Sequence, residues 1–199
     1  MNMYKILLTV AFSMLFSEAI SVPGDYATIQ EAIDVSVNGD IISVAAGTYN
    51  EELLITKSIS LLGESGTIIN ASGLSDAIII GFSEQNDGYV DGVEISGFEI
   101  IGDLSTMIGI HVLPGCRNIE IKNNIIHGME LPNSNSAANG SYGILSWGQD
   151  ESFGPENIVI SNNEIYDIRG LGVSFGSYSN DITVNNNSIH NITPTDTDF

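Results

Sequence analysis

One short motif occurs three times in this chain and constrains its fold more than any other feature. The copies are NIEIKNNIIHGM from Asn118, NIVISNNEIYDI from Asn157 and DITVNNNSIHNI from Asp181. Each copy has apolar residues at alternate positions, then an asparagine pair, then a second apolar run. From Asn124 to Asn163 the step is 39 residues (163 − 124), and from Asn163 to Asn187 it is 24 (187 − 163). The second unit therefore carries an insertion.

The spacing of the motif predicts a β-solenoid. A period of roughly 20 to 50 residues is typical of solenoids, propellers and arrays. The apolar runs are short and no helical pattern separates them, which favours strands. In a β-solenoid each strand pairs in parallel with the same strand one coil away, about 4.8 Å along the axis. Alternate side chains then enter a narrow apolar interior.

The asparagines of the motif have a structural interpretation. Asparagine tolerates the left-handed conformation of a sharp turn and can bond its own backbone. Stacked copies can also link their amides. A ligand or metal role would need a matching column of carboxylates in neighbouring coils, and the sequence contains none. We therefore interpret Asn124, Asn163 and Asn187 as a structural ladder and assign no metal ligands.

The first 21 residues have the pattern of a secretory signal peptide. Lys5 provides the positive charge, residues 6–16 the apolar stretch, and Ala19-Ile20-Ser21 a small-x-small cleavage site. Cleavage there leaves one domain, residues 22–199, with 178 residues (199 − 21) or about seven coils. No closing element is predicted in residues 193–199, so we expect this domain to be truncated at its C-terminal end. The expected location is extracellular, on the cell surface, or periplasmic.

A short amphipathic helix is predicted over residues 28–37. Ile29, Ile33 and Val37 share one helical face, and Thr28 with Glu31 forms a capping-box pattern. Such a helix would cover the apolar interior of the first coil. Strands are predicted at residues 41–44, 53–55, 59–62 and 67–69, with a turn at residues 47–49.

This N-terminal segment resembles the start of the pectin lyase-like right-handed β-helix superfamily. The matching segments are TIQEAI from Thr28, NGD from Asn38, GTYNE from Gly47 and ISLLGE from Ile59. The later coils are similar to those of the periplasmic copper-accessory family and of surface-layer and carbohydrate-associated β-helix proteins. The resemblance implies an all-β, right-handed, single-stranded parallel β-helix with a short N-terminal capping α-helix. It implies no single activity, because the superfamily includes lyases, hydrolases, esterases and adhesins. The QAVAL-like, DFIFG-like and LGRPW segments of pectin methylesterases are absent.

The charge of the chain excludes two classes of partner. The formal net charge is −20, from 25 acidic and 5 basic residues. Such a surface repels nucleic acid and anionic membranes, so we exclude both. The single cysteine, Cys116, permits no internal disulfide and is expected to be a small buried apolar residue. Sequons for N-glycosylation begin at Asn70, Asn139, Asn186 and Asn191.

Candidate binding residues lie where the chain departs from the repeat. Insertions follow Met129 and Ser146, and binding sites favour loops on rigid scaffolds. These insertions contain Tyr142, Trp147 and Phe153, which we expect to be stacking platforms for sugar rings. The superfamily resemblance implies a saccharide groove on the outer face of one sheet. The repeat alignment places His111, Leu145 and Ser174 at equivalent outward positions.

Candidate catalytic residues follow from two reaction types. A uronate lyase would use Arg169 or Arg117 as base or charge neutraliser, with His111 as acid or base. A hydrolase would instead use two carboxylates, such as Asp150 with Glu151 or Asp167. Polyuronates would be repelled by the negative chain unless calcium bridged the two, so calcium is a candidate cofactor. Residues 149–151 and 196–198 are its candidate ligands.

Three functions remain open at this point. The first is a secreted or surface module that binds polysaccharide or cell-surface glycan without an active site. The second is a polysaccharide-degrading enzyme, a pectate- or alginate-type lyase before a glycoside hydrolase. The third is a structural or adhesive surface protein.

Overall fold

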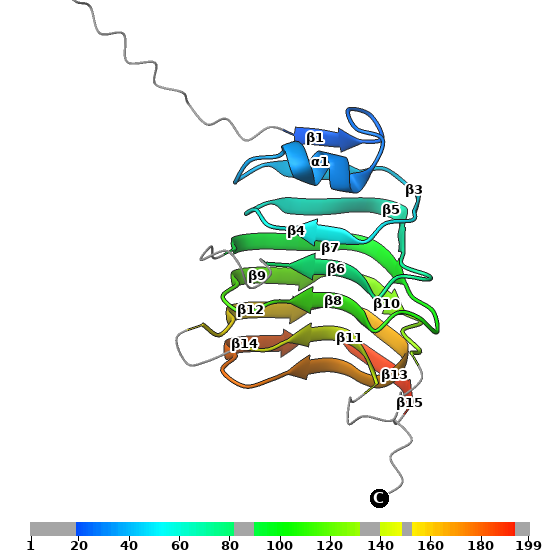
Figure 1. Ribbon diagram of the computed structural model, residues 1–199, viewed down its shortest axis with the longest axis vertical. Helices are drawn as coiled ribbons and strands as arrows, with labels where there is room; N and C mark the ends of the chain where they lie inside the picture. Colours follow the sequence, from blue (N-terminus) through cyan, green and yellow to red (C-terminus); the bar gives the residue numbers. More distant parts are fainter. Residues whose placement is uncertain (1–18, 82–89, 132–139, 149–152, 194–199) are drawn as a thin grey trace, which may run out of the picture.

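The protein is a parallel β-helix whose coils stack along one long axis (Figure 1). The computed structural model describes residues 19–81, 90–131, 140–148 and 153–193. Over these residues it has one helix, α1 (Ile29–Val35), and fifteen strands. The strands are β1 (Ala19–Val22), β2 (Ile41–Val44), β3 (Gly47–Tyr49), β4 (Leu53–Ile55), β5 (Ser60–Asn70), β6 (Asp76–Ile80), β7 (Asp91–Ile101), β8 (Ile108–Val112), β9 (Arg117–Lys122), β10 (Ile125–His127), β11 (Ser141–Ser146), β12 (Glu156–Ser161), β13 (Glu164–Phe175), β14 (Asn180–Asn185) and β15 (Ser188–Thr193).

The coils form three faces, named here sheets 1, 2 and 3. Sheet 1 contains β1, β2, β9, β12, β14 and the first halves of β5 and β7. Sheet 2 contains β3, β10, β15, the second halves of β5 and β7, and the first half of β13. Sheet 3 contains β4, β6, β8, β11 and the second half of β13. The described strands all pair in parallel, so the predicted all-β solenoid with a short N-terminal helix is confirmed.

Apolar side chains at alternate positions fill the interior. In sheet 1 the strand register aligns one inward residue per coil: Ile20, Ile42, Leu61, Ile95, Ile121, Ile160 and Val184. The first six are at most 8% exposed. Full burial of one such aliphatic side chain contributes about 2 kcal/mol. Six of the seven members lie within residues 22–199, for which the repeat step predicts about seven coils.

Glycine at one position of sheet 3 makes room for isoleucine from sheet 2. The position is occupied by Gly109, Gly143 and Gly172 in successive coils. A Cβ added to Gly143 would lie 2.6 Å from Cγ2 of the buried Ile165. A Cβ added to Gly172 would meet Ile189 at the same distance, 2.6 Å. The recurring glycine therefore sets how closely the two sheets approach across the interior.

The two asparagines of each pair have different roles. The first asparagines are Asn123, Asn162 and Asn186, with φ of 56°, 56° and 54°. They take the left-handed conformation that turns the chain from sheet 1 to sheet 2, which asparagine tolerates better than most residues. The second asparagine points inward, and Asn124 and Asn163 are 1% and 2% exposed. A buried amide of this kind must be hydrogen bonded to avoid a desolvation cost.

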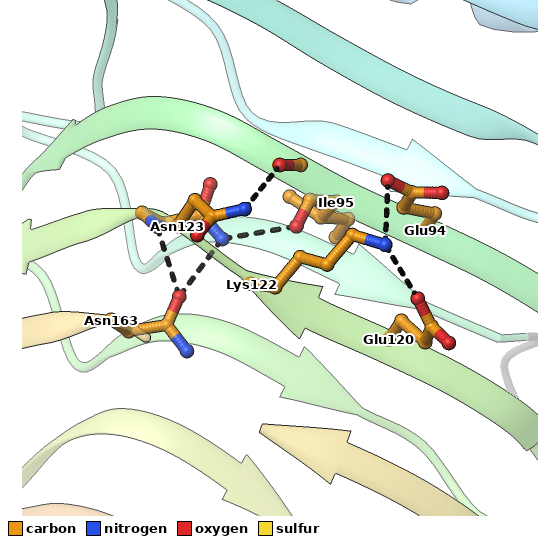
Figure 2. Close-up of polar contacts among 8 residues, drawn as sticks. Glu94, Ile95, Glu120, Lys122, Asn123 and Asn163 are labelled. Atoms are coloured by element: carbon orange, nitrogen blue, oxygen red, sulfur yellow. Dashed lines mark hydrogen bonds and ion pairs between the residues drawn. The ribbon is translucent and has the colours of Figure 1, made fainter. Parts of the chain in front are cut away.

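Hydrogen bonds between coils satisfy the buried amides. The Asn163 Oδ1 accepts from the backbone N–H of Asn124 at 3.0 Å and from its Nδ2 at 3.1 Å (Figure 2). Asn163 in turn donates through its backbone N–H and its Nδ2 to Asn187 Oδ1, at 2.9 and 3.0 Å. Its Nδ2 also donates to the carbonyl of Ile121 at 2.9 Å. Asn124 Oδ1 accepts from the backbone N–H of Phe98 at 3.1 Å, in the coil before.

A lysine separates two stacked carboxylates on the outer face of sheet 1. Glu94 and Glu120 are register partners in adjacent coils, so their like charges would repel. The Lys122 Nζ lies 3.1 Å from Glu94 and 2.7 Å from Glu120 (Figure 2). Hydrogen bonds to Glu120 and then Glu94 raise the pKa of Lys122. Lys122, one of five basic residues in the chain, thus reduces the repulsion between these two carboxylates.

Helix α1 covers the first coil and packs against β1, β2 and β4 (Figure 1). Thr28 Oγ1 accepts from the Glu31 N–H, and the Glu31 carboxylate accepts from the Thr28 N–H, so the predicted capping box is confirmed. The helix ends at Val35, earlier than predicted. Ser36 leaves the helical conformation, with its hydroxyl donating to the Ile33 carbonyl. Val37 therefore lies outside the helix and is 48% exposed, so its predicted place on the apolar face is wrong.

Two further details of the N-terminal half differ from the sequence prediction. The predicted turn at residues 47–49 is strand β3, which pairs with the second half of β5. The strands predicted at residues 59–62 and 67–69 are one strand, β5, with a bulge between Leu62 and Thr67. Glycines at this corner allow close backbone packing: a Cβ on Gly97 would lie 2.2 Å from the Gly63 carbonyl oxygen. The strand can therefore bend without being interrupted.

The expected signal-peptide cleavage site falls inside β1. Ile20 is 8% exposed in the interior column. The backbone N–H and hydroxyl of Ser21 both donate to the Asp25 carboxylate, at 2.8 and 2.7 Å. A cut between Ser21 and Val22 would remove three of the four residues of β1 and both of these bonds.

We predict that processing occurs before Ile20 instead. Ser17 and Ala19 place small residues three and one positions before that bond, as a signal peptidase requires. N-terminal sequencing of the secreted protein should give Ile20 as the first residue. Ala19→Arg should block processing, whereas Ser21→Arg should be processed normally. A mature chain that begins at Val22 would contradict this prediction.

A second prediction separates the roles of the paired asparagines. Asn163→Ala leaves the backbone N–H of Asn124 and the carbonyl of Ile121 without these hydrogen bonds in the interior. The free energy of unfolding should therefore fall by about 3 kcal/mol. Asn162→Gly keeps the left-handed turn and should change it by less than about 0.5 kcal/mol. Urea unfolding followed by circular dichroism measures both. Equal losses of unfolding free energy in the two variants would show that the buried asparagine stabilises the fold no more than the exposed one of the pair.

Candidate functional site

The outer face of sheet 3 carries the candidate site. Its register aligns one outward residue from each coil: Leu54, Ile79, His111, Leu145 and Ser174. The expected equivalence of His111, Leu145 and Ser174 is therefore confirmed. The inward neighbours Ile110 and Ile144 are fully buried, which fixes the backbone that presents this face.

A chain of three polar side chains lies at the centre of the face. The His111 Nδ1 lies 3.5 Å from the Asp76 Oδ2. The Trp147 indole N–H donates to the His111 Nε2 at 3.3 Å. The Asp76 and His111 side chains are 12% and 15% exposed, whereas Trp147 is 40% exposed. The group therefore runs from a nearly buried carboxylate to a half-exposed aromatic ring.

The indole determines the tautomer of His111. An indole nitrogen only donates, so the His111 Nε2 must be the unprotonated nitrogen of a neutral ring. The Nδ1 then carries the hydrogen and faces Asp76, whose carboxylate accepts it. A carboxylate behind an imidazole fixes the orientation of the ring. The arrangement thus presents an acceptor nitrogen and an aromatic ring to the outer face of sheet 3.

Asp76 was missed by the sequence analysis. It starts β6, in register with Ile108 of β8, and is 8% exposed. An acidic residue at the start of the apolar run DAIII was the one available signal, because a carboxylate is seldom buried without a partner. Its partner His111 is 35 residues away in the sequence. The coil register brings the two together.

The three predicted aromatic residues come from different parts of the coil. Trp147 follows β11 and reaches His111, as described above. Tyr142 lies on β11 in register with Ile108 and Leu171, and is partly buried. Phe153 instead packs on the turn after β8, where a Cβ on Gly115 would lie 2.7 Å from its ring.

The predicted catalytic residues are only partly described. Arg169 lies on β13 in register with Thr193 of sheet 2, one residue before the chain turns at Gly170 into sheet 3. His111 is on the outer face of sheet 3, where it contacts Asp76 and Trp147. Asp150 and Glu151 lie outside the described residues. Both candidate calcium loops, residues 149–151 and 196–198, lie outside them as well.

The outer face of sheet 2 carries a stack of rings. His127, Tyr166 and His190 are register partners, with ring centroids 4.7 and 5.2 Å apart and interplanar angles of 4° and 1°. The His127 and His190 Nε2 atoms lie 3.1 and 3.2 Å from Glu99 and Glu164. Burial, followed by the negative charges nearby, raises the pKa of Tyr166. Within the stack both faces of the Tyr166 ring and one face of each imidazole are covered.

An acidic hollow lies at the start of sheet 1 strands. Its volume is about 410 Å³, and it is lined by Asp91, Arg117, Asn118, Glu156, Asn157 and Asp181. The Arg117 Nε lies 3.5 Å from Glu156, and the Asn118 Nδ2 donates to Asp91 at 2.6 Å. Within residues 19–193, gaps aside, no three His, Cys, Asp or Glu side chains are placed to hold one metal ion. The hollow is therefore not a candidate metal site among these residues.

Cys116 lies inside the β-helix, as expected. It is 1% exposed, its thiol donates to the Ile80 carbonyl at 3.3 Å, and burial raises its pKa to about 12. Such a thiol is inert as a nucleophile. Across the described residues no helix is long and apolar enough to cross a membrane.

Comparison with known proteins gives one sequence relative. No protein-family model matches the chain. A cell surface glycoprotein of Methanothermus fervidus is 36% identical over 111 residues, which cover 53% of this chain and 17% of that protein. The chain thus spans about a sixth of the length of this curated relative.

Two solved structures are similar in fold. ORF18 of Geobacillus virus E2 superposes with a TM-score of 0.59 and 19% identity, over 85% of this chain and 40% of that one. An alginate lyase from Paenibacillus sp. strain FPU-7 gives a TM-score of 0.48 and 17% identity, over 85% of this chain and 75% of that one. The first likeness shows a shared fold alone, and a TM-score below 0.5 supports no argument about this chain.

The tautomer of His111 is directly testable. Long-range ¹H–¹⁵N NMR spectra of the three imidazoles should show His111 protonated on Nδ1 at neutral pH, with Nε2 unprotonated. His111→Asn assigns the signal. Trp147→Phe combined with Asp76→Ala removes both partners of the ring and should give a mixture of the two tautomers. Protonation of Nε2 in the native protein would contradict the described contact.

Proposed function

We propose that this protein is a cell-surface β-helix that binds a neutral polysaccharide on the outer face of sheet 3. The observation that carries the proposal is the indole of Trp147, which is 40% exposed and hydrogen bonded to His111. An exposed ring that is already held in place loses little side-chain entropy when a ligand stacks on it. Sugar rings present apolar C–H faces that suit such an aromatic surface.

Polar and apolar groups elsewhere on the outer face of sheet 3 add contacts for a sugar chain. The hydroxyl of Ser174, at an outward position of the same face, can hydrogen bond to a sugar hydroxyl while His111 keeps its bond to the indole. Leu54 and Leu171, on the same sheet, are 44% and 40% exposed. Hydroxyl recognition beside apolar contact is the usual chemistry of small-molecule sites. Successive coils repeat the outward positions, which favours a chain-like ligand over a single sugar.

Charge favours a neutral glycan over a polyuronate. The chain carries a formal net charge of −20, and Asp76 adds a carboxylate at the site itself. A polyanionic ligand would be repelled over distances up to the Debye length, about 8 Å at physiological ionic strength. The proposed binding of a neutral glycan needs no calcium, so binding is compared with and without calcium below.

Surface location is supported by two observations. The N-terminal residues have the pattern of a secretory signal peptide. The matched relative is called a cell surface glycoprotein.

The binding test uses a panel of neutral and uronate polysaccharides, with and without calcium. Trp147→Ala should weaken binding of the neutral glycan by about tenfold or more, because it removes the stacking surface. Trp147→Phe should retain most of the affinity. His190→Ala removes an exposed ring from sheet 2 and should leave binding unchanged. Equal effects of Trp147→Ala and His190→Ala, or preferred binding of polyuronates, would contradict the proposal.

Catalysis is a second candidate because Asp76 orients the imidazole of His111 as it would orient a general base. The same panel distinguishes it by release of unsaturated or reducing ends. Product that disappears in His111→Asn and Asp76→Asn would replace binding with turnover. Binding without product would leave the binding proposal in place.

A further inference from the structure

We propose that Asn186 is an N-glycosylation site. It begins the sequon Asn186-Asn187-Ser188, at the corner where the chain passes from β14 to β15. The acceptor is its Nδ2, and the donor is a lipid-linked oligosaccharide with an anomeric phosphate leaving group. The proposal depends on export of the chain, which is part of the proposed function, but not on glycan binding at sheet 3.

The exposure of Asn186 follows from its place in the coil. Asn186 is exposed, with φ of 54°, and its side chain leaves the corner between sheets 1 and 2. Asn123 and Asn162 occupy the same corner in earlier coils and are also exposed. Those two coils have neighbours on both sides, so the corner stays accessible inside the stack. Among these three asparagines, Asn186 alone is followed by the serine of a sequon.

Asn70 begins another sequon, but its amide is engaged. The Asn70 Nδ2 donates to Asn50 Oδ1 at 2.7 Å. Its Oδ1 accepts from the Ser72 backbone N–H at 3.2 Å and from the Ser72 hydroxyl at 2.7 Å. Both the nucleophilic nitrogen and the sequon hydroxyl are therefore held within the folded corner. Modification of Asn70 would break the bond to Asn50.

Of the remaining two sequons, the one at Asn191 is a weaker acceptor and the one at Asn139 lies outside the described residues. Asn191 is exposed, but Asp167 and Gly128, at the same corner of earlier coils, are partly buried. The exposure of Asn191 thus depends on its being in the last described coil. Asn139 lies outside the described residues.

The reaction balances without a redox partner. The Asn186 Nδ2 forms a bond to the anomeric carbon of the donor sugar and loses one proton. The bond from that carbon to the phosphate oxygen breaks, and the lipid-linked phosphate leaves with the electron pair. An oligosaccharyltransferase of the exporting cell supplies the catalyst.

The position of Asn186 keeps the proposed binding face free. The corner between sheets 1 and 2 is separate from sheet 3, which carries Trp147 and His111. A glycan on Asn186 would therefore shield one edge of the β-helix without covering the exposed indole. Solubility and protease resistance at this edge are the properties that it would change.

The test uses the folded full chain carrying Asn139→Gln, a purified oligosaccharyltransferase that recognises N-x-S/T, and a lipid-linked oligosaccharide. Glycan release in H₂¹⁸O followed by peptide mass spectrometry measures the occupancy of each asparagine. Asn186 should be modified about tenfold or more faster than Asn70, because the Asn70 amide is hydrogen bonded in the fold. Short peptides of residues 66–75 and 182–191 lack the tertiary hydrogen bond of Asn70, so between them this difference should disappear.

Matched changes at Ser188 isolate the sequon. Ser188→Ala leaves Asn186 and its turn in place and should abolish modification there, whereas Ser188→Thr should retain it. Thermal unfolding of both variants checks that the fold persists. The proposal is overturned if Asn186 stays unmodified in the folded chain while a peptide of residues 182–191 is modified. It is equally overturned if Asn70 reacts as fast as Asn186. Neither result bears on glycan binding at sheet 3, so the two proposals can fail separately.

Discussion

Hydrogen bonds from each buried asparagine to the coil behind it fix the register on which the other features depend. The Asn163 amide joins three coils by bonding to Asn124 on one side and Asn187 on the other. A slip of one residue would leave this amide unpaired in the interior and would turn the isoleucine columns outward. The same register aligns the glycines of sheet 3 with the isoleucines of sheet 2. It also places His111 over the coil that carries Asp76.

The repeat predicts the periodic strands and inward columns. It cannot predict which side chains meet across coils. The strands, the inward columns and the equivalence of His111, Leu145 and Ser174 follow from local alternation and from the motif spacing. The capping box of α1 is equally local. By contrast, the Asp76–His111 and His111–Trp147 contacts join residues 35 and 36 positions apart, across segments of unequal length. No spacing rule covers an insertion, so these pairs became visible only in the fold.

The three outer faces differ in what they can offer a ligand. On sheet 1, Lys122 is engaged with two carboxylates, and the nearby hollow is acidic. On sheet 2, the rings of His127, Tyr166 and His190 cover one another. On sheet 3, a half-exposed indole is hydrogen bonded to the imidazole of His111. This difference, rather than the fold itself, favours sheet 3 as the binding face, since β-helices support many functions.

The directional bonding of the asparagines has a consequence for how such a chain can change length in evolution. In the coils of Asn124 and Asn163, the buried amide accepts from the coil before it, and the same asparagine donates to the coil after it. A duplicated segment of one full 24-residue unit brings its own acceptor and donor, so the interior remains satisfied on both sides. A duplication of half a unit does not. Gains and losses should therefore occur in whole units, while the loops at the corners vary freely.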